Sequence, residues 1–186
     1  MKFIKFFLII FIFLIIPLKA YSNEQLINKL KEGGKLVFIR HAYAPGNGDP
    51  AHFNLSDCST QRNLNQEGRN QAKFIGSIFI KYNIPISNVL SSEWCRCKET
   101  ASIAFSEKYQ TASFLNSFYE KRFSLNKQNQ VKELKKHIKN WKGDKNLIFV
   151  THYVVISEIL NVYPLSGEIV ISDKNYNVIG NLKSNF

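Results

Sequence analysis

The chain has 186 residues, with 25 lysines and arginines against 14 acidic residues and a formal net charge of +11. Hydrophobic residues make up 45% of it, which excludes a disordered, charge-rich chain and is enough for the core of one domain. The positive balance favours anionic partners, which would be phosphate esters, anionic lipid headgroups or nucleic acid, unless it is simply a solvated basic surface. The aromatic-rich signatures of nucleic-acid modules are absent, so we expect no nucleic-acid partner.

Residues 1–22 have the pattern of an export signal. Two early lysines precede an apolar run, Phe6 to Leu18, which is shorter than the about 20 residues needed to span a membrane. Ala20 and Ser22 then place small side chains at the two positions read by signal peptidase, so we expect cleavage after Ser22. The alternative is a retained membrane anchor. The mature domain, residues 23–186, would lie in the periplasm or otherwise outside the cytoplasm.

Apolar strands alternate with amphipathic helices along the rest of the chain. This alternation predicts an α/β domain with a largely parallel sheet. Helices are indicated by apolar residues three and four positions apart, and strands by short apolar runs. We predict strands at 35–39, 86–90, 111–115, 146–150, 168–172 and 177–182, and helices at 66–82, 93–105, 130–141 and 154–160.

The segment from Ala42 to Asn63 contains glycine and proline and has no periodicity. A loop of this length in a compact domain is usually functional or disordered. The chain also has three cysteines, for which an oxidising compartment favours one disulfide and one remaining thiol. Cys95 and Cys97 are too close in sequence to bridge without strain, so we expect Cys58 to pair with one of them.

Two predicted strands end in the same way. The runs starting at Leu36 and Leu147 are each followed by a polar residue and then a histidine, His41 or His152. Ligands of open α/β sheets bind beyond the carboxyl ends of the strands. If the two strands are parallel neighbours, both histidines reach one crevice.

Two arginines accompany the histidines. Arg40 directly precedes His41, and Arg96 lies in the first turns of the helix that follows a third strand end. A helix N-terminus favours anions, and a guanidinium adds forked donors suited to phosphate oxygens. Arg96 taken alone would be an exposed or salt-bridged residue, but its place beside the other strand ends favours an anion site.

These residues resemble the three signatures of the histidine phosphatase superfamily, which includes the phosphoglycerate mutases. The likeness runs from about residue 35 to 160 and implies a three-layer α/β/α sandwich with a largely parallel central sheet. The matching segments are Arg40-His41-Ala42, Ser91 to Ala101 with Arg96 and Thr100, Thr151-His152, and Leu64 to Ala72, which is similar to the segment after the first signature.

The resemblance implies a phosphomonoesterase in which His41 attacks phosphorus and forms a phosphohistidine that water then hydrolyses. Arg40, Arg96 and His152 would hold the phosphoryl oxygens, and no metal or other cofactor is implied. We expect His152 to act as a cation, so that the rate falls above neutral pH. Arg62, which follows the long loop, is equally well explained as a phosphate ligand or as a surface residue.

The general acid is the least defined part of this site. Family members often place a glutamate after the third strand, or an aspartate directly after the second histidine. Tyr153 follows His152 here, so the second arrangement is absent. Glu120 lies in about the right region and is the candidate acid, unless it is a plain surface carboxylate. Glu93 is another candidate, although it would also suit the nearby helix N-terminus.

The short inserts between motifs, the leader and Cys58 resemble a small exported branch, similar to the enzyme that removes phosphate from heptose in the lipopolysaccharide core. A small-molecule phosphate ester, with an envelope sugar phosphate as a candidate, is the expected substrate. The alternatives are an exported phosphate-ester binding protein without turnover and a phosphomutase. The lysines between Lys132 and Lys142 form a basic helix that would either face a membrane surface or simply be solvated.

Overall fold

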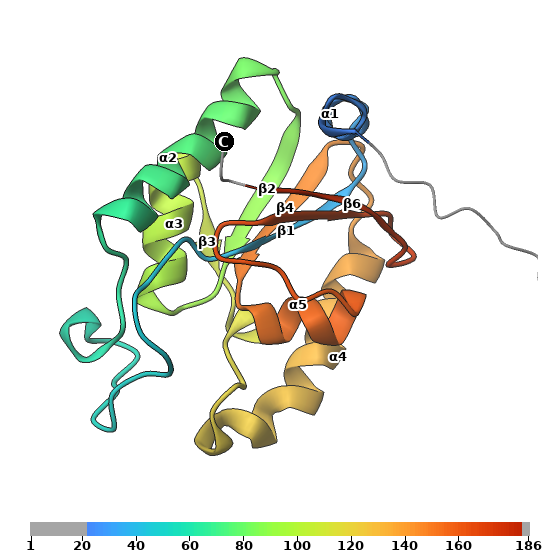
Figure 1. The fold of residues 1–186 in the computed structure, drawn as a ribbon. Coiled ribbons are helices and arrows are strands. Elements are labelled where there is room, and N and C mark those ends of the chain that lie inside the picture. Colours follow the sequence, from blue (N-terminus) through green and yellow to red (C-terminus); the bar gives the residue numbers. More distant parts are fainter. Residues whose placement is uncertain (1–21, 184–186) are drawn as a thin grey trace, which may run out of the picture.

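A computed structural model describes residues 22–183 and places six strands in one sheet, in the order β3-β2-β4-β1-β5-β6 (Figure 1). The first four strands in this order are parallel, whereas β5 is antiparallel to β1 and β6 is antiparallel to β5. The largely parallel sheet expected from the sequence is confirmed. The strands are β1 (Leu36–Arg40), β2 (Ile86–Ser91), β3 (Gln110–Thr111), β4 (Asn146–Thr151), β5 (Ile169–Ser172) and β6 (Val178–Leu182).

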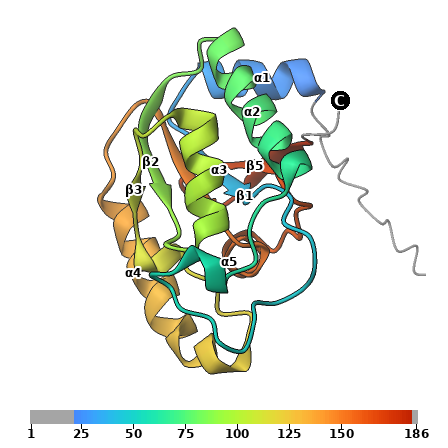
Figure 2. The same cartoon turned by 90° about the vertical axis from the view of Figure 1, so that its left-hand side faces the viewer.

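Helices cover both faces of the sheet and complete three layers (Figures 1 and 2). Successive side chains of a strand face opposite sides, so Val37 enters one core and Phe38 the other. The first core is closed by α1 (Asn23–Lys31), α2 (Gln66–Lys81) and α3 (Cys95–Phe105), and the second by α4 (Lys127–Asn140) and α5 (Tyr153–Leu160).

Strands β1 and β4 lie side by side in the centre of the sheet. Arg40 is the parallel partner of Thr151, so the residues that follow, His41 and His152, leave the sheet at the same edge. Apart from the half-buried Arg40, both strands are buried along their length, as expected of central parallel strands covered on both faces.

Helix α1 was not predicted from the sequence. Its N-cap is Ser22, the residue expected to end the leader, whose hydroxyl accepts a hydrogen bond from the backbone N–H of Gln25. The side chain of Gln25 accepts in return from the N–H of Ser22, which completes a capping box. The rest of the predicted leader lies outside the described residues. Within residues 22–183, no helix has both the length and the apolar character needed to cross a membrane.

Most predicted boundaries agree with the structure to within one residue, and three elements differ by more. The strand at 111–115 reduces to Gln110–Thr111, and the next residues form a short 3-10 turn in which the N–H of Leu115 donates to the carbonyl of Ala112. The helix predicted from Glu93 begins at Cys95, because Trp94 is extended, with a ψ of 136°, and forms the N-cap. The lysine-rich helix begins three residues earlier than predicted, at Lys127.

Candidate active site

The two histidines meet at the carboxyl ends of β1 and β4. Their ring centroids are 5.4 Å apart, and each residue is 3% exposed. They lie in one pocket with all the other site residues expected from the sequence. The pocket is lined by His41, His152, Arg40, Arg62, Arg96 and Glu120, together with Asp49, Trp94, Tyr119 and Tyr153 among others.

The tautomer of His41 is defined by its two neighbours. Its Nδ1 lies 2.9 Å from the carbonyl oxygen of Ala42, which can only accept, so Nδ1 carries the proton. Nε2 therefore keeps a lone pair and accepts a hydrogen bond from Nε of Arg96 at 3.2 Å. A histidine nucleophile needs this arrangement, because the attacking nitrogen must be unprotonated.

The pocket favours the neutral form of both histidines. Burial first, and then the positive charge of Arg96, hold the pKa of His41 and of His152 well below the usual value. Arg40 and Arg62 act in the same direction. The lowered pKa of His152 disfavours the cationic form expected from the sequence, and three guanidinium groups supply positive charge to the pocket.

His152 is oriented by a short chain of hydrogen bonds. Its Nε2 lies 3.0 Å from Oγ of Ser92, which in turn lies 3.0 Å from Oδ1 of Asn116. The amide of Asn116 is itself oriented, because its Nδ2 donates to the carboxylate of Glu93 at 2.6 Å. The hydroxyl of Ser92 thus donates to Asn116 and accepts from His152. Glu93 acts on the site through Asn116 and not as a group facing the histidines.

Arg40 lies along the pocket wall. Its guanidinium carbon is 5.2 Å from the ring centroid of Tyr153, and its Nη1 donates to the carbonyl of Pro164 at 2.9 Å. Its Nε is buried and has no hydrogen-bond partner among the described residues. A buried donor of this kind suits an oxygen atom of an anion.

Arg96 and Asp49 form a buried ion pair that the sequence analysis did not identify. Nη1 of Arg96 lies 2.8 Å from Oδ1 of Asp49, and Nη2 lies 3.1 Å from Oδ2. Asp49 also accepts from the indole of Trp94 and from the backbone N–H of Arg62, both at 3.1 Å. Burial opposes the charge of Asp49, but Arg96 outweighs it, so the pKa of Asp49 is below its usual value.

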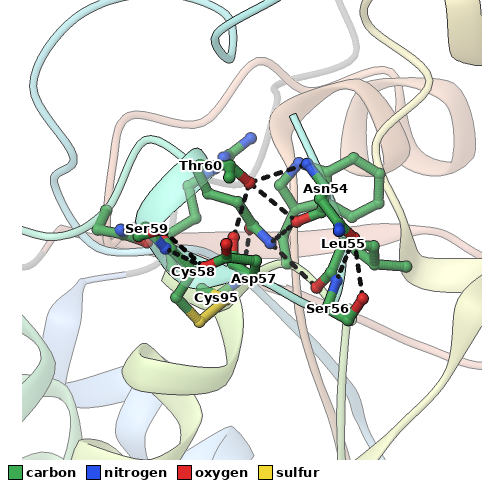
Figure 3. The surroundings of a disulfide bond; sticks show 12 residues. Asn54, Leu55, Ser56, Asp57, Cys58, Ser59, Thr60 and Cys95 are labelled. Carbon is green, nitrogen blue, oxygen red and sulfur yellow. Dashed lines mark hydrogen bonds between the residues drawn. A yellow bond between two sulfur atoms is a disulfide. The ribbon is translucent and has the colours of Figure 1, made fainter. Parts of the chain in front are cut away.

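The long loop is tied to helix α3 by a disulfide (Figure 3). Cys58 is bonded to Cys95, the first residue of α3, and the Cα atoms are 5.7 Å apart. Of the two partners expected for Cys58, the structure has Cys95 and not Cys97. Cys97 is free and buried, and burial raises the pKa of its thiol to about 12.

Non-covalent contacts hold the same loop. The side-chain oxygen of Gln61 accepts from the N–H of Cys95 at 3.0 Å, and the ring of Phe53 stacks on Trp94 with centroids 5.0 Å apart. Asp57 accepts from the N–H of Ser59 and caps the turn at the disulfide (Figure 3). The loop is therefore an ordered wall of the pocket.

Arg62 and Glu120 also line the pocket, but both are engaged with this loop. Arg62 donates from Nε to the carbonyl of Gly48 at 2.8 Å and from Nη1 to the carbonyl of Ala44. Glu120 accepts the backbone N–H of Asp49 at 2.8 Å through Oε1. Its other oxygen pairs with the guanidinium of Arg122 at 2.7 Å.

Comparisons with known proteins agree with this fold. A family model described as the histidine phosphatase superfamily (branch 1) matches residues 36–148. The phosphoglycerate mutase of Thermus thermophilus is similar with a TM-score of 0.56 and 16% identity, over 80% of this chain and 98% of that one. SixA of Agrobacterium tumefaciens, a proposed phosphohistidine phosphatase, gives 0.56 and 16% over 81% and 98%. These two likenesses show the fold alone. No curated protein matches the chain.

Proposed function

The chain belongs to the histidine phosphatase superfamily, and we propose that it is an exported phosphomonoesterase that forms a phosphohistidine on His41. The observation that carries this proposal is the convergence of His41, in its attacking tautomer, with Arg40, Arg96 and His152 in one pocket. Three arginines and two carboxylates line that pocket, so its net positive charge favours the binding of an anion.

In the proposed reaction, Nε2 of His41 attacks phosphorus as the ester P–O bond breaks, and the leaving oxygen takes a proton. Water then attacks the phosphohistidine, the N–P bond breaks, and phosphate leaves. Guanidinium groups such as those of Arg40 and Arg96 offset the charge on the phosphoryl oxygens. The carbonyl of Ala42 holds the Nδ1 proton as the ring becomes positive.

A sugar phosphate of the cell envelope is the proposed substrate. The leader pattern in residues 1–22 supports export. The pocket rim supports a ring-shaped leaving group, because Tyr119 and Tyr153 stand edge to face with centroids 5.8 Å apart and Tyr119 is 47% exposed. Aromatic faces of this kind combine an apolar surface with a polar hydroxyl.

The basic helix supports a further part of this proposal, association with an anionic membrane surface. Leu134 and Ile138 bury one side of α4, and the opposite side exposes lysines. Sedimentation with anionic and with neutral lipid vesicles tests this, and equal binding to both would contradict it. The exposed lysines of this helix and the turn after it are Lys132, Lys135, Lys136, Lys139 and Lys142.

The test of the enzymatic proposal is phosphate release from p-nitrophenyl phosphate and from a panel of sugar phosphates. We expect turnover by the mature chain, a phosphohistidine trapped by rapid denaturation, and loss of both in His41→Ala. His52→Ala is the matched control, because His52 is exposed on the long loop. Equal turnover by wild type and His41→Ala would overturn the proposal. Tight binding without release would indicate a binding protein, and phosphate transfer within the substrate a mutase.

A further inference from the structure

The Asp49–Arg96 ion pair occupies the pocket that a substrate phosphate must enter, and its side chains are only 3% and 4% exposed. Building on the proposed phosphatase function, we propose that Asp49 is the proton carrier of the reaction. It is paired with Arg96 in the free enzyme, and a bound phosphate releases it as a carboxylic acid that protonates the leaving oxygen.

Competition for Arg96 follows from the geometry. The guanidinium donates from Nε to His41 and from Nη1 and Nη2 to Asp49, so both of its binding edges are already in use. A phosphoryl group within reach of Nε2 of His41 lies where Arg96 donates, and a dianion competes with the carboxylate for the same N–H groups. Two anions that share one buried site raise each other's pKa, which favours the uptake of a proton by one of them.

The surroundings of Asp49 determine which anion takes up a proton. Among the described residues, Arg96 from α3 is the only side chain that forms an ion pair with Asp49. Arg62, in the same loop as Asp49, donates its backbone N–H to Asp49, and its guanidinium donates to loop carbonyls. Glu120 adds a nearby negative charge, and the pocket favours the neutral form of the neighbouring histidines. When a phosphate takes up Arg96, burial still raises the pKa of Asp49, whereas the N–H groups of Arg62 and Trp94 and the charge of Arg62 lower it.

The position of Asp49 is maintained when the ion pair opens. The indole N–H of Trp94 donates to Oδ2, and the backbone N–H of Asp49 is held by Glu120. The carboxyl group therefore stays on the pocket wall beside the guanidinium that binds the phosphate. A proton donor needs such a fixed position within hydrogen-bond reach of the substrate.

The proposed cycle is balanced. Asp49 takes a proton from solvent as phosphate binds and gives it to the leaving oxygen while the P–O bond breaks and the N–P bond to His41 forms. The resulting carboxylate accepts a proton from the water that attacks the phosphohistidine, and phosphate is released. Asp49 then returns its proton to solvent and pairs with Arg96 again.

Glu120 has a different role in this proposal. Its two oxygens are engaged with the N–H of Asp49 and with Arg122, and Arg122, unlike Arg96, is not among the residues that line the pocket. Glu120 is thus a positioning residue that acts through Asp49. The roles of Asp49 and Glu120 can therefore be distinguished by experiment.

The first experiment compares leaving groups. For Asp49→Asn we expect kcat to fall about 100-fold or more with glycerol phosphate, whose alkoxide needs a proton, but less than about 10-fold with p-nitrophenyl phosphate. For Glu120→Gln we expect similar losses with both substrates. Equal losses for Asp49→Asn, or a selective loss for Glu120→Gln, would overturn the assignment. Absence of turnover by the wild type would instead sink the proposed function.

The second experiment needs no substitution of Asp49 and no turnover. The chain has only four aspartates, so their carboxyl carbons can be followed by 13C NMR in selectively labelled wild type. On saturation with tungstate, a phosphate-like dianion, we expect the Asp49 signal alone to move to the position of a protonated carboxyl group at neutral pH. An Asp49 that stays ionised with tungstate bound would overturn the proposal. Signals are assigned from Asp57→Asn, Asp144→Asn and Asp173→Asn.

Discussion

Nε of Arg96 lies 3.2 Å from Nε2 of His41, so the arginine of α3 donates to the nitrogen that we propose attacks phosphorus. The lone pair of His41 is therefore engaged until an anion takes over the guanidinium. This single contact links the protonation state of His41 to the occupancy of the pocket.

The first prediction concerns that protonation state. We expect His41 to remain neutral, with the proton on Nδ1, as the pH falls below 6.5, the ordinary pKa of histidine, because burial and Arg96 depress its pKa. Below pH 6.5 the unfolded chain binds a proton that the folded chain does not, so this site makes the fold less stable as the pH falls. 15N NMR of labelled histidines measures the titration, and a His41 that protonates at pH 6.5 or above would contradict it.

The second prediction concerns Arg96→Lys. A lysine keeps the charge but cannot bridge His41 and Asp49 with a planar fork, so we expect kcat/KM to fall about 100-fold. Arg69→Lys is the matched control, because Arg69 pairs with Glu99 in a partly exposed salt bridge. We expect its kcat/KM to be unchanged. Similar values for the two variants would mean that the fork of Arg96 has no part in the reaction.

The third prediction concerns the disulfide. Cys58 and Cys95 are 37 residues apart, and a loop of this size predicts about 4 kcal/mol of stabilisation from the crosslink. Reduction should lower the free energy of unfolding by that order, and kcat/KM should fall because the same loop carries Asp49. Denaturant titrations with and without reductant measure the change.

A matched pair of variants controls for other effects of the reductant. Cys58→Ser with Cys95→Ser should be insensitive to it, whereas Cys97→Ala should respond as wild type does, since Cys97 is outside the disulfide. A wild type with the same stability before and after reduction would refute the prediction.

The fourth prediction compares two glycines of α2. A Cβ at Gly68 would collide with the backbone oxygen of Tyr43, two residues after His41, and a Cβ at Gly76 with the backbone oxygen of Ala104 at the other end of α3 from Arg96. Both alanine variants should lose about 1–3 kcal/mol of stability. Only Gly68→Ala should also lower kcat/KM, and thermal unfolding with kinetics separates the two. Normal kinetics for Gly68→Ala would show that the close contact between Gly68 and the backbone of Tyr43 does not position the site.

The fold was largely predictable because its central strands are uniformly apolar. The runs that became β1 and β4 are long enough to be recognised without context, and their parallel pairing follows from the helices between them. Strand β3 was overestimated because Leu115 looks like a strand residue but is buried by a 3-10 turn. Helix α1 was not predicted because its nine residues offer only three buried apolar side chains, Leu26, Ile27 and Leu30, which is a short pattern to recognise.

The part of the site at the strand ends was predictable from local pattern, because Arg40 ends one apolar run and His41 and His152 each follow one. Arg96, Arg62 and Glu120 were candidates whose place in the pocket depended on the fold. Asp49 could not be predicted, because a carboxylate next to glycine and proline is typical of any turn, and its partner Arg96 is 47 positions away. Long-range pairs of this kind depend on how a loop folds back, which no local periodicity encodes.

Strands β1 and β4 run in register from Leu36 and Leu147 to Arg40 and Thr151, and one histidine follows each. Inserting or deleting one residue in either strand would carry its imidazole about 3.3 Å along the sheet and turn it to the other face. Exchanging one apolar side chain for another leaves the two rings together. The length of these two segments, more than their composition, should therefore limit how far such a chain can diverge and still keep both imidazoles in one pocket.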